Sequence, residues 1–138
     1  MTETVVTVEE SGQGLYTQNI KAAGHPLTAD EPAGVGGLDL GPAPYDLLLA
    51  ALGACTSMTL RMYADQKKWG LKHVAVRLTH KKEAAAGNKK IDVITRSITL
   101  EGDLDDAQRQ RLLEIANKCP LHRTLTETTR PAITSSIN

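Results

Sequence analysis

Two cysteines are the residues in this sequence whose chemistry is most distinctive. Cys55 lies within Ala54-Cys55-Thr56, and Cys119 is followed directly by Pro120. In a reducing compartment two cysteines are not a structural disulfide framework; they are free buried thiols, metal ligands or a redox pair. A free cysteine is also among the most buried residue types, so a purely structural role is an open alternative on spacing alone.

The two cysteines have different surroundings along the chain. Cys55 falls within a predicted helix, where residues three, four and seven positions away share its face. Those residues are Ala51, Leu52, Met58, Thr59 and Met62. An apolar environment raises a thiol pKa and makes the sulfur inert. Cys119 has His122 and Arg123 close behind it, and a neighbouring cation can ionise a thiol.

A metal site is the weaker interpretation of these residues. Cys119 and His122 have a spacing that two metal ligands can use, but a structural zinc site needs about four ligands. The other candidates, His25, His73 and His80, are scattered along the chain. We therefore expect no metal and no other cofactor.

Two pairs of acidic residues and one glycine cluster are only weak indications of a functional site. Asp30-Glu31 and Asp105-Asp106 lie at predicted loop or helix starts, where water or the helix dipole stabilises carboxylates. Gly34-Val-Gly-Gly37 lacks the Lys-Ser/Thr that would complete a phosphate-binding loop. Neither pattern predicts a catalytic acid pair or a nucleotide site.

A buried helix from Tyr45 to Lys68 is the strongest structural signal. Pro44 suits its first turn, and Gly70 ends it. Its first two-thirds is apolar on every side, which is typical of a buried helix. Before it we expect three short strands, around Val5–Val8, Leu15–Ile20 and His25–Asp30, and then a Gly- and Pro-rich loop over residues 31–44.

The second half of the chain predicts a hairpin, a helix and a last strand. Residues 71–80 and 91–100 alternate as antiparallel strands, and either Asp103 or Asp105 can cap the following helix. Residues 121–127 predict a helical turn, and residues 131–137 a final strand. The order predicts one α+β domain over residues 1–138, with an antiparallel sheet packed on helices. A helix apolar on every side needs more cover than one small sheet, so we expect a homodimer.

Charge and hydropathy exclude several partners. The 138 residues carry 16 Lys and Arg against 16 Asp and Glu, with no clustered basic excess. We therefore expect binding to neither nucleic acid nor a membrane surface. The acidic start shows no targeting segment, and no uninterrupted apolar run approaches the ~18 residues of a membrane span. A cytoplasmic location is the expectation.

Motifs around both cysteines resemble those of the OsmC/Ohr family, especially its OsmC-like redox branch. The resemblance covers the chain from about residue 5 to residue 137. The motifs are Asp30-Glu-Pro32, Gly36-Gly37, Gly41-Pro-Ala-Pro-Tyr-Asp-Leu-Leu48, Ala51-Leu-Gly-Ala-Cys-Thr56, Met58-Thr-Leu-Arg-Met-Tyr-Ala64 and Lys118-Cys-Pro-Leu-His-Arg-Thr124.

The resemblance implies both a fold and an activity. It implies an intertwined homodimer with two interface sites, a six-stranded sheet and a long central helix that carries Cys55. It also implies stress-related reduction of organic hydroperoxides, in which the first thiolate attacks the peroxide and becomes sulfenic acid. Cys119 then condenses with it to a disulfide, and an external dithiol restores the pair. We expect Cys55 to be the buried attacking thiol and Cys119 the more mobile resolving thiol.

The residues that activate the thiol in this family do not match. The hydroperoxide-reducing members hold the thiolate with an Arg from the N-terminal strands, and here no Arg precedes Arg61. Their helix also starts with a Glu where this chain has Tyr45, followed by Asp46. On an ideal helix Asp46 points about 180° away from Cys55. Candidate replacements for the cation are His122, Arg123, Lys21 or a residue of the partner subunit.

These departures keep a non-catalytic alternative open. The chain could retain the fold and bind a small hydrophobic ligand in an apolar pocket at the dimer interface. That pocket would be built from Leu52, Met58, Thr59 and Met62. Methionine suits such a role because its side chain adapts to irregular partners.

Overall fold

The structure is a computed structural model that describes residues 3–127 and 131–138. The chain divides into two compact units, Met1–Leu48 and Leu49–Asn138. The first unit holds a small sheet and a loop. The second holds a long hairpin, most of the central helix and two shorter helices.

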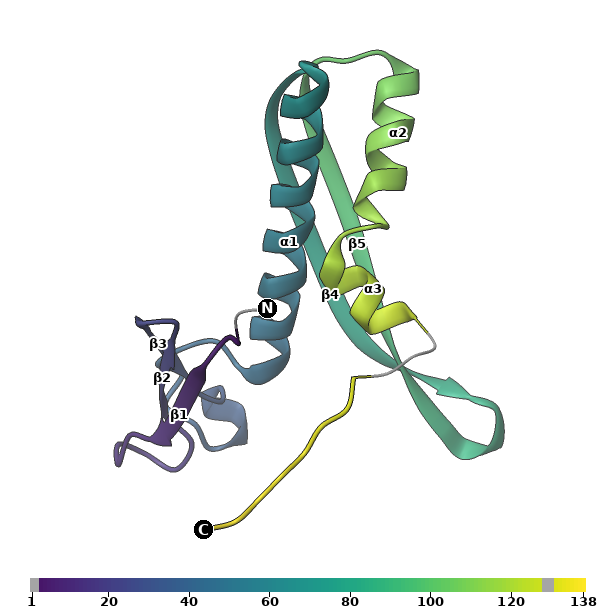
Figure 1. Cartoon of the computed structure of the whole chain (residues 1–138). Coiled ribbons are helices and arrows are strands. Elements are labelled where there is room, and N and C mark those ends of the chain that lie inside the picture. The colour runs from purple at the N-terminus through teal and green to yellow at the C-terminus, as the bar shows by residue number, and fades with distance from the viewer. Residues whose placement is uncertain (1–2, 128–130) are drawn as a thin grey trace. The chain divides into compact units, whose positions relative to one another are not determined.

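The first unit contains a three-stranded antiparallel sheet, drawn in purple in Figure 1. Its strands are β1 (Val6–Glu10), β2 (Gln18–Ala22) and β3 (His25–Ala29), in the order β1-β2-β3. The register pairs Val6 with Ala22 and Gln18 with Ala29. The three strands predicted from the sequence are confirmed.

A loop that is held in place by hydrogen bonds to Asp30 follows the sheet. One 3₁₀ turn, η1 (Ala33–Val35), interrupts this otherwise irregular segment. Asp30 is only 2% exposed, and its carboxylate accepts hydrogen bonds from Thr17 Oγ1 at 2.7 Å and from the backbone N–H groups of Glu31 and Leu40. Burial raises the pKa of Asp30, but these donors outweigh it, so the pKa lies below its ordinary value. The Asp30 carboxylate is therefore ionised, and its hydrogen bonds stabilise the conformation of the loop.

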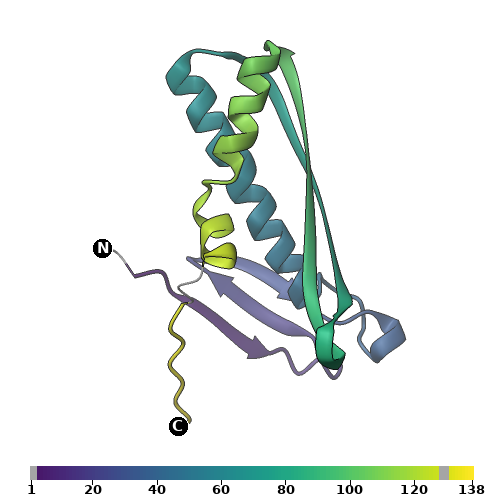
Figure 2. The same ribbon diagram turned by 90° about the vertical axis from the view of Figure 1, so that its right-hand side faces the viewer.

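The second unit is a long hairpin covered by helices on one face. The central helix α1 (Pro44–Lys67) leads into β4 (Gly70–Ala85), the turn η2 (Ala86–Asn88) and β5 (Lys89–Asp103). Two helices follow, α2 (Asp106–Ala116) and α3 (Pro120–Thr126). Figures 1 and 2 show α1 and α2 lying side by side along the same face of the β4–β5 hairpin.

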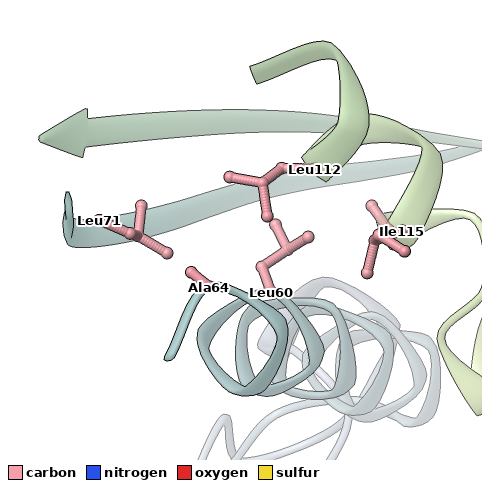
Figure 3. Packing of buried hydrophobic residues seen from close by; sticks show 6 residues of the cluster. Leu60, Ala64, Leu71, Leu112 and Ile115 are labelled. Carbon is pink, nitrogen blue, oxygen red and sulfur yellow. The ribbon is translucent and has the colours of Figure 1, made fainter. Parts of the chain in front are cut away.

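The core of this unit lies between α1, α2 and β4. Leu60, Ala64, Leu71, Leu112 and Ile115 point toward one another in Figure 3, and together with Ala116 they form one buried cluster. The helix α2 begins with a capping box, in which Asp105 accepts from the Gln108 N–H and the Gln108 side chain accepts from the Asp105 N–H. Of the two predicted caps, Asp105 is thus the one used.

Two sequence expectations about strands are not met within this chain. The final strand predicted over residues 131–137 is wrong, because that segment has no strand structure, and Ile133 and Ile137 are 86% and 101% exposed. An alternating segment becomes a strand only when a neighbouring edge bonds its backbone. The described residues form one three-stranded and one two-stranded sheet, not the six-stranded sheet implied by the resemblance.

The helix α1 is the one candidate membrane span found in the described part of the chain, by length and composition alone. Its Leu60 and Ala64 side chains are fully buried against the other elements of the second unit. Of the window that could span a membrane, 22% is buried within the chain.

Candidate functional site

The structure brings the two cysteines together within the second unit. Both are free thiols, and the Cys55 side chain lies close enough to the Cys119 sulfur to lower its pKa. Cys119 is fully buried, whereas Cys55 is half-buried. The expectation that Cys55 is a buried thiol is wrong for the single chain, because α1 has elements packed on only part of its surface.

Pro120 explains the position of Cys119. Proline suits the first position of a helix and forces the residue before it into an extended conformation. Cys119 accordingly has ψ 143° and is the N-cap of α3, and its Sγ accepts a hydrogen bond from the His122 N–H at 3.3 Å. The extended conformation of Cys119 before Pro120 thus directs its sulfur toward the first turn of α3.

Arg96 is the cation of this site. It comes from β5, and its guanidinium donates to three acceptors on two helices. These are Thr56 Oγ1 at 3.0 Å, Ala116 O at 3.3 Å and Asn117 Oδ1 at 2.8 Å. The last two acceptors lie at the C-terminal end of α2, where backbone carbonyls lack helical partners and the helix dipole favours a positive charge. Arg96 is therefore fixed, with its charge next to the cysteine pair.

The environment of Cys119 favours the thiolate. Burial raises the pKa of Cys119, but several contacts act against burial and outweigh it. They are the hydrogen bond from the His122 N–H, the nearby Cys55 and Thr56 side chains, and the positive charge of Arg96. The pKa of Cys119 therefore lies below its ordinary value of 9.0.

Sequence reasoning missed Arg96, although the sequence contains a signal for it. The inward face of β5 carries Ile94, Ile98 and Leu100, and Arg96 occupies the same face between them. An arginine in an apolar alternation is unusual, because a buried guanidinium needs acceptors to compensate for lost water. The interruption of the apolar alternation at Arg96 therefore indicates that this side chain has specific hydrogen-bond acceptors.

The cations proposed from the sequence have other surroundings. Arg123 is exposed, and its Nε donates to Glu127 Oε1 at 2.8 Å. Burial, and then the charge of Arg96, lower the pKa of His122, so its imidazole is held neutral. Lys21 lies on β2 in the first unit.

Tyr45 and Asp46 belong to the start of α1 in the first unit. Asp46 Oδ2 accepts a hydrogen bond from the Ala43 N–H at 3.0 Å, which satisfies a backbone donor at the helix entrance. Tyr45 is 45% exposed. The observed role of Asp46 is therefore to start the helix.

A cavity of about 480 Å³ lies beside Arg96 in the second unit. Five of its ten lining residues are aliphatic, and the other five, Asp92, Arg96, Asn117, His122 and Thr126, add polar groups. Of the four predicted pocket residues, Leu52 lines this cavity and Thr59 is half-buried, while Met58 and Met62 are 60% and 65% exposed. The four do not share one cavity in a single chain.

Metal ligands do not gather anywhere in the part of the chain that the structure describes. No group of three or more His, Cys, Asp or Glu side chains there could hold an ion.

Solved structures of other proteins share this fold. An organic hydroperoxide resistance protein OsmC from Legionella pneumophila matches with a TM-score of 0.69 and 17% identity, over 94% of this chain and 93% of that chain. An OsmC-like protein from Mycoplasma pneumoniae matches with a TM-score of 0.74 and 16% identity, over 92% and 89%. An organic hydroperoxide resistance protein from Elizabethkingia anophelis matches with a TM-score of 0.69 and 15% identity, over 94% and 92%.

Sequence comparison identifies the family. No curated protein sequence matched the chain. The family described as OsmC-like protein matches residues 36–134, a range that contains both cysteines and Arg96. This chain therefore belongs to the OsmC-like family.

Proposed function

We propose that this chain is a thiol-dependent redox protein that reduces organic hydroperoxides through a Cys55–Cys119 disulfide cycle. The contact between two reduced cysteines, one of them in a site that favours the thiolate, carries this proposal. The names of the Legionella and Elizabethkingia proteins, which share the fold, are consistent with it.

The cycle follows from the accessibility of the two sulfurs. Cys55 is the more accessible thiol, so it attacks the terminal peroxide oxygen and becomes sulfenic acid while an alcohol leaves. The Cys119 thiolate then attacks the Cys55 sulfur, which releases hydroxide and forms the disulfide. An external dithiol reduces that disulfide, and a cytoplasmic location supplies such reductants. No metal or other cofactor takes part in these steps.

The cavity beside Arg96 favours a bulky organic peroxide. Its apolar lining consists of Leu52, Val93, Ile94, Leu113 and Leu125. An aromatic or alkyl substituent gains free energy when such side chains remove it from water, whereas hydrogen peroxide gains none. The site therefore favours organic hydroperoxides over hydrogen peroxide.

Dithiol-dependent turnover of cumene hydroperoxide and hydrogen peroxide tests the function. We expect the wild type to use cumene hydroperoxide with a kcat/KM at least about tenfold higher, because tenfold corresponds to only ~1.4 kcal/mol of apolar burial. Cys55→Ser is the matched control, since it removes one sulfur and keeps a hydroxyl. Wild-type turnover no greater than that of Cys55→Ser would sink the enzyme hypothesis.

The non-catalytic alternative has one observation in its favour, the cavity itself. A cavity of about 480 Å³ that has five aliphatic lining residues is large enough for a small hydrophobic molecule. Absence of peroxide turnover, together with saturable binding of a hydrophobic fluorescent probe that Leu52→Trp blocks, would favour this alternative.

We also propose that the chain works as a homodimer that covers the exposed side of α1. Met58 and Met62 are one helical turn apart, and Ala51 and Ala54 are exposed on the same helix. An exposed apolar stripe on a central helix is typical of an interface.

A charge on this stripe should break the dimer. We expect Met62→Glu to convert a wild-type dimer into a monomer in sedimentation at micromolar concentration, because an unpaired carboxylate is costly to bury. Leu15→Glu is the control, since Leu15 is 73% exposed in a loop of the first unit. A wild type that sediments as a stable folded monomer would contradict the dimer.

A further inference from the structure

The groups that stabilise negative charge in this site converge on Cys119. Its Sγ accepts the His122 N–H at 3.3 Å, and the nearby Cys55 and Thr56 side chains also lower its pKa. Cys119 is fully buried, so solvent does not weaken these contacts. Of the two cysteines, Cys119, whose sulfur is less accessible, is therefore the one whose surroundings stabilise a thiolate.

Thr56 links Cys119 to Arg96 through a single hydroxyl. Thr56 is fully buried; its Oγ1 donates to Leu52 O at 2.7 Å and accepts from Arg96 Nη1 at 3.0 Å. A hydroxyl has one proton, so it can donate to Leu52 O or to the Cys119 sulfur, but not fully to both. When Cys119 is a thiolate the proton can turn toward the sulfur, while Leu52 O keeps its helical bond from the Thr56 N–H.

Arg96 holds this hydroxyl in place. Because Arg96 Nη1 occupies one lone pair of Thr56 Oγ1, the hydroxyl proton must point elsewhere. Ala116 O and Asn117 Oδ1 anchor the same guanidinium to the end of α2, just before Cys119. Arg96 thus acts on Cys119 both by its charge and through Thr56.

We propose that Cys119 is the base that accepts the proton of Cys55 during attack on the peroxide, and that Arg96 and Thr56 are positioning residues for this base. The proposal deepens the proposed function and rests on it. It gives the resolving cysteine a task before the disulfide forms, and it explains how Cys55 is activated without an Arg in the N-terminal strands.

The proton and electrons balance through the cycle. The Cys55 S–H proton passes to the Cys119 thiolate while the Cys55 sulfur attacks the terminal oxygen of ROOH and the O–O bond breaks. Cys55 is oxidised to sulfenic acid, the peroxide is reduced to RO⁻, and Cys119 returns the proton to give ROH. The regenerated Cys119 thiolate attacks the Cys55 sulfur, the S–O bond breaks, and hydroxide leaves.

The charged groups around Cys119 predict the direction of its titration. The titratable and charged side chains that act on it are Cys55 on α1 and Arg96 on β5. His122 lies on α3, α2 ends in the uncharged amide of Asn117, and Lys118 between them is exposed. His122 is held neutral, so Arg96 supplies the positive charge. Since the Cys119 pKa is lowered from 9.0, the thiolate persists on acidification below pH 9.0, until the pH reaches the folded-state pKa.

Ultraviolet thiolate absorbance of Cys55→Ser isolates Cys119, because the chain has two cysteines. The serine keeps an O–H donor toward Cys119. We expect a titration midpoint below 9.0 in this background. Adding Thr56→Val or Arg96→Met should move the midpoint to higher pH, because each removes a contact that stabilises the thiolate. Thr56→Ser and Arg96→Lys should restore much of the shift, and Arg123→Met is the arginine control that should leave it unchanged.

The rate of the first oxidation tests the base itself. In Cys119→Ser we expect cumene hydroperoxide to oxidise Cys55 about 100-fold more slowly than in the wild type at neutral pH. The pH dependence of this rate should no longer follow the titration of Cys119. Equal rates and equal pH profiles in the two proteins would overturn the base role. A Cys119 midpoint at or above 9.0 would also overturn it. A wild type inert to peroxide would refute the proposed function, and with it the base role, even if the Cys119 titration is as expected.

Discussion

Cys119→Ser is expected to stop multiple-turnover peroxide reduction while it still consumes one equivalent of hydroperoxide. In the wild type the Cys119 sulfur lies near Cys55, so we expect a sulfenic acid formed there to be captured as a disulfide. Serine cannot form that bond, and Cys55 should remain as sulfenic acid or oxidise further to sulfinic acid. We expect steady-state turnover to fall by at least about 100-fold, because reduction must then proceed without the disulfide.

Mass spectrometry after one equivalent of hydroperoxide checks this expectation. The wild type should give an intramolecular link between the peptides that hold Cys55 and Cys119, and Cys119→Ser should give added oxygen on the Cys55 peptide. Because the Cys55 side chain lies near the Cys119 sulfur, the link should form without a large rearrangement. Oxidation of Cys119 in a protein whose Cys55 stays reduced would reverse the two roles.

The regular elements of this fold could be predicted because their signals are local. Pro44 and Gly70 bracket α1, Asp105 caps α2, and alternation of apolar residues marks β4 and β5. Each signal acts within a few residues along the chain. The false strand over residues 131–137 shows the limit of this reasoning, because alternation does not supply the second edge that a strand requires.

The cation of the site could not be assigned from the sequence, because its contacts also depend on elements that are far apart along the chain. The two cysteines belong to recognisable motifs, but Arg96 reaches them only through the pairing of β5 with β4 and the packing of α2 on the hairpin. Its place between Ile94 and Ile98 shows that a buried charge is present, and gives no indication of its partner. Thr56 is next to Cys55 in the same motif, but nothing in the sequence indicates that Arg96 donates a hydrogen bond to it.

The order of burial of the two cysteines also depends on tertiary structure. A helix that is apolar on every side gives no indication of which face is covered first. Within one chain, α2 and the hairpin cover the Leu60 face, which leaves Met58 and Met62 exposed. Cys55 is only half-buried as a result, while the turn after α2 encloses Cys119.

The second large effect is expected in the core that holds α2 in place. Leu112 is fully buried in contact with the Leu60 cluster, so Leu112→Ala removes apolar contacts and leaves a cavity. We expect it to lower the free energy of unfolding by about 3 kcal/mol, within the usual range for buried leucines. Urea unfolding followed by circular dichroism measures the change.

Leu113→Ala is the matched control, because it makes the same replacement one residue along the same helix. Leu113 is 49% exposed, so the expected loss is roughly 1 kcal/mol or less, and helix propensity changes equally in the two variants. Equal losses in the two variants would contradict the observed orientation of α2. That orientation matters for the chemistry, because the end of α2 supplies Ala116 O and Asn117 Oδ1 to Arg96. Leu112→Ala should therefore also raise the Cys119 titration midpoint, whereas Leu113→Ala should leave it in place.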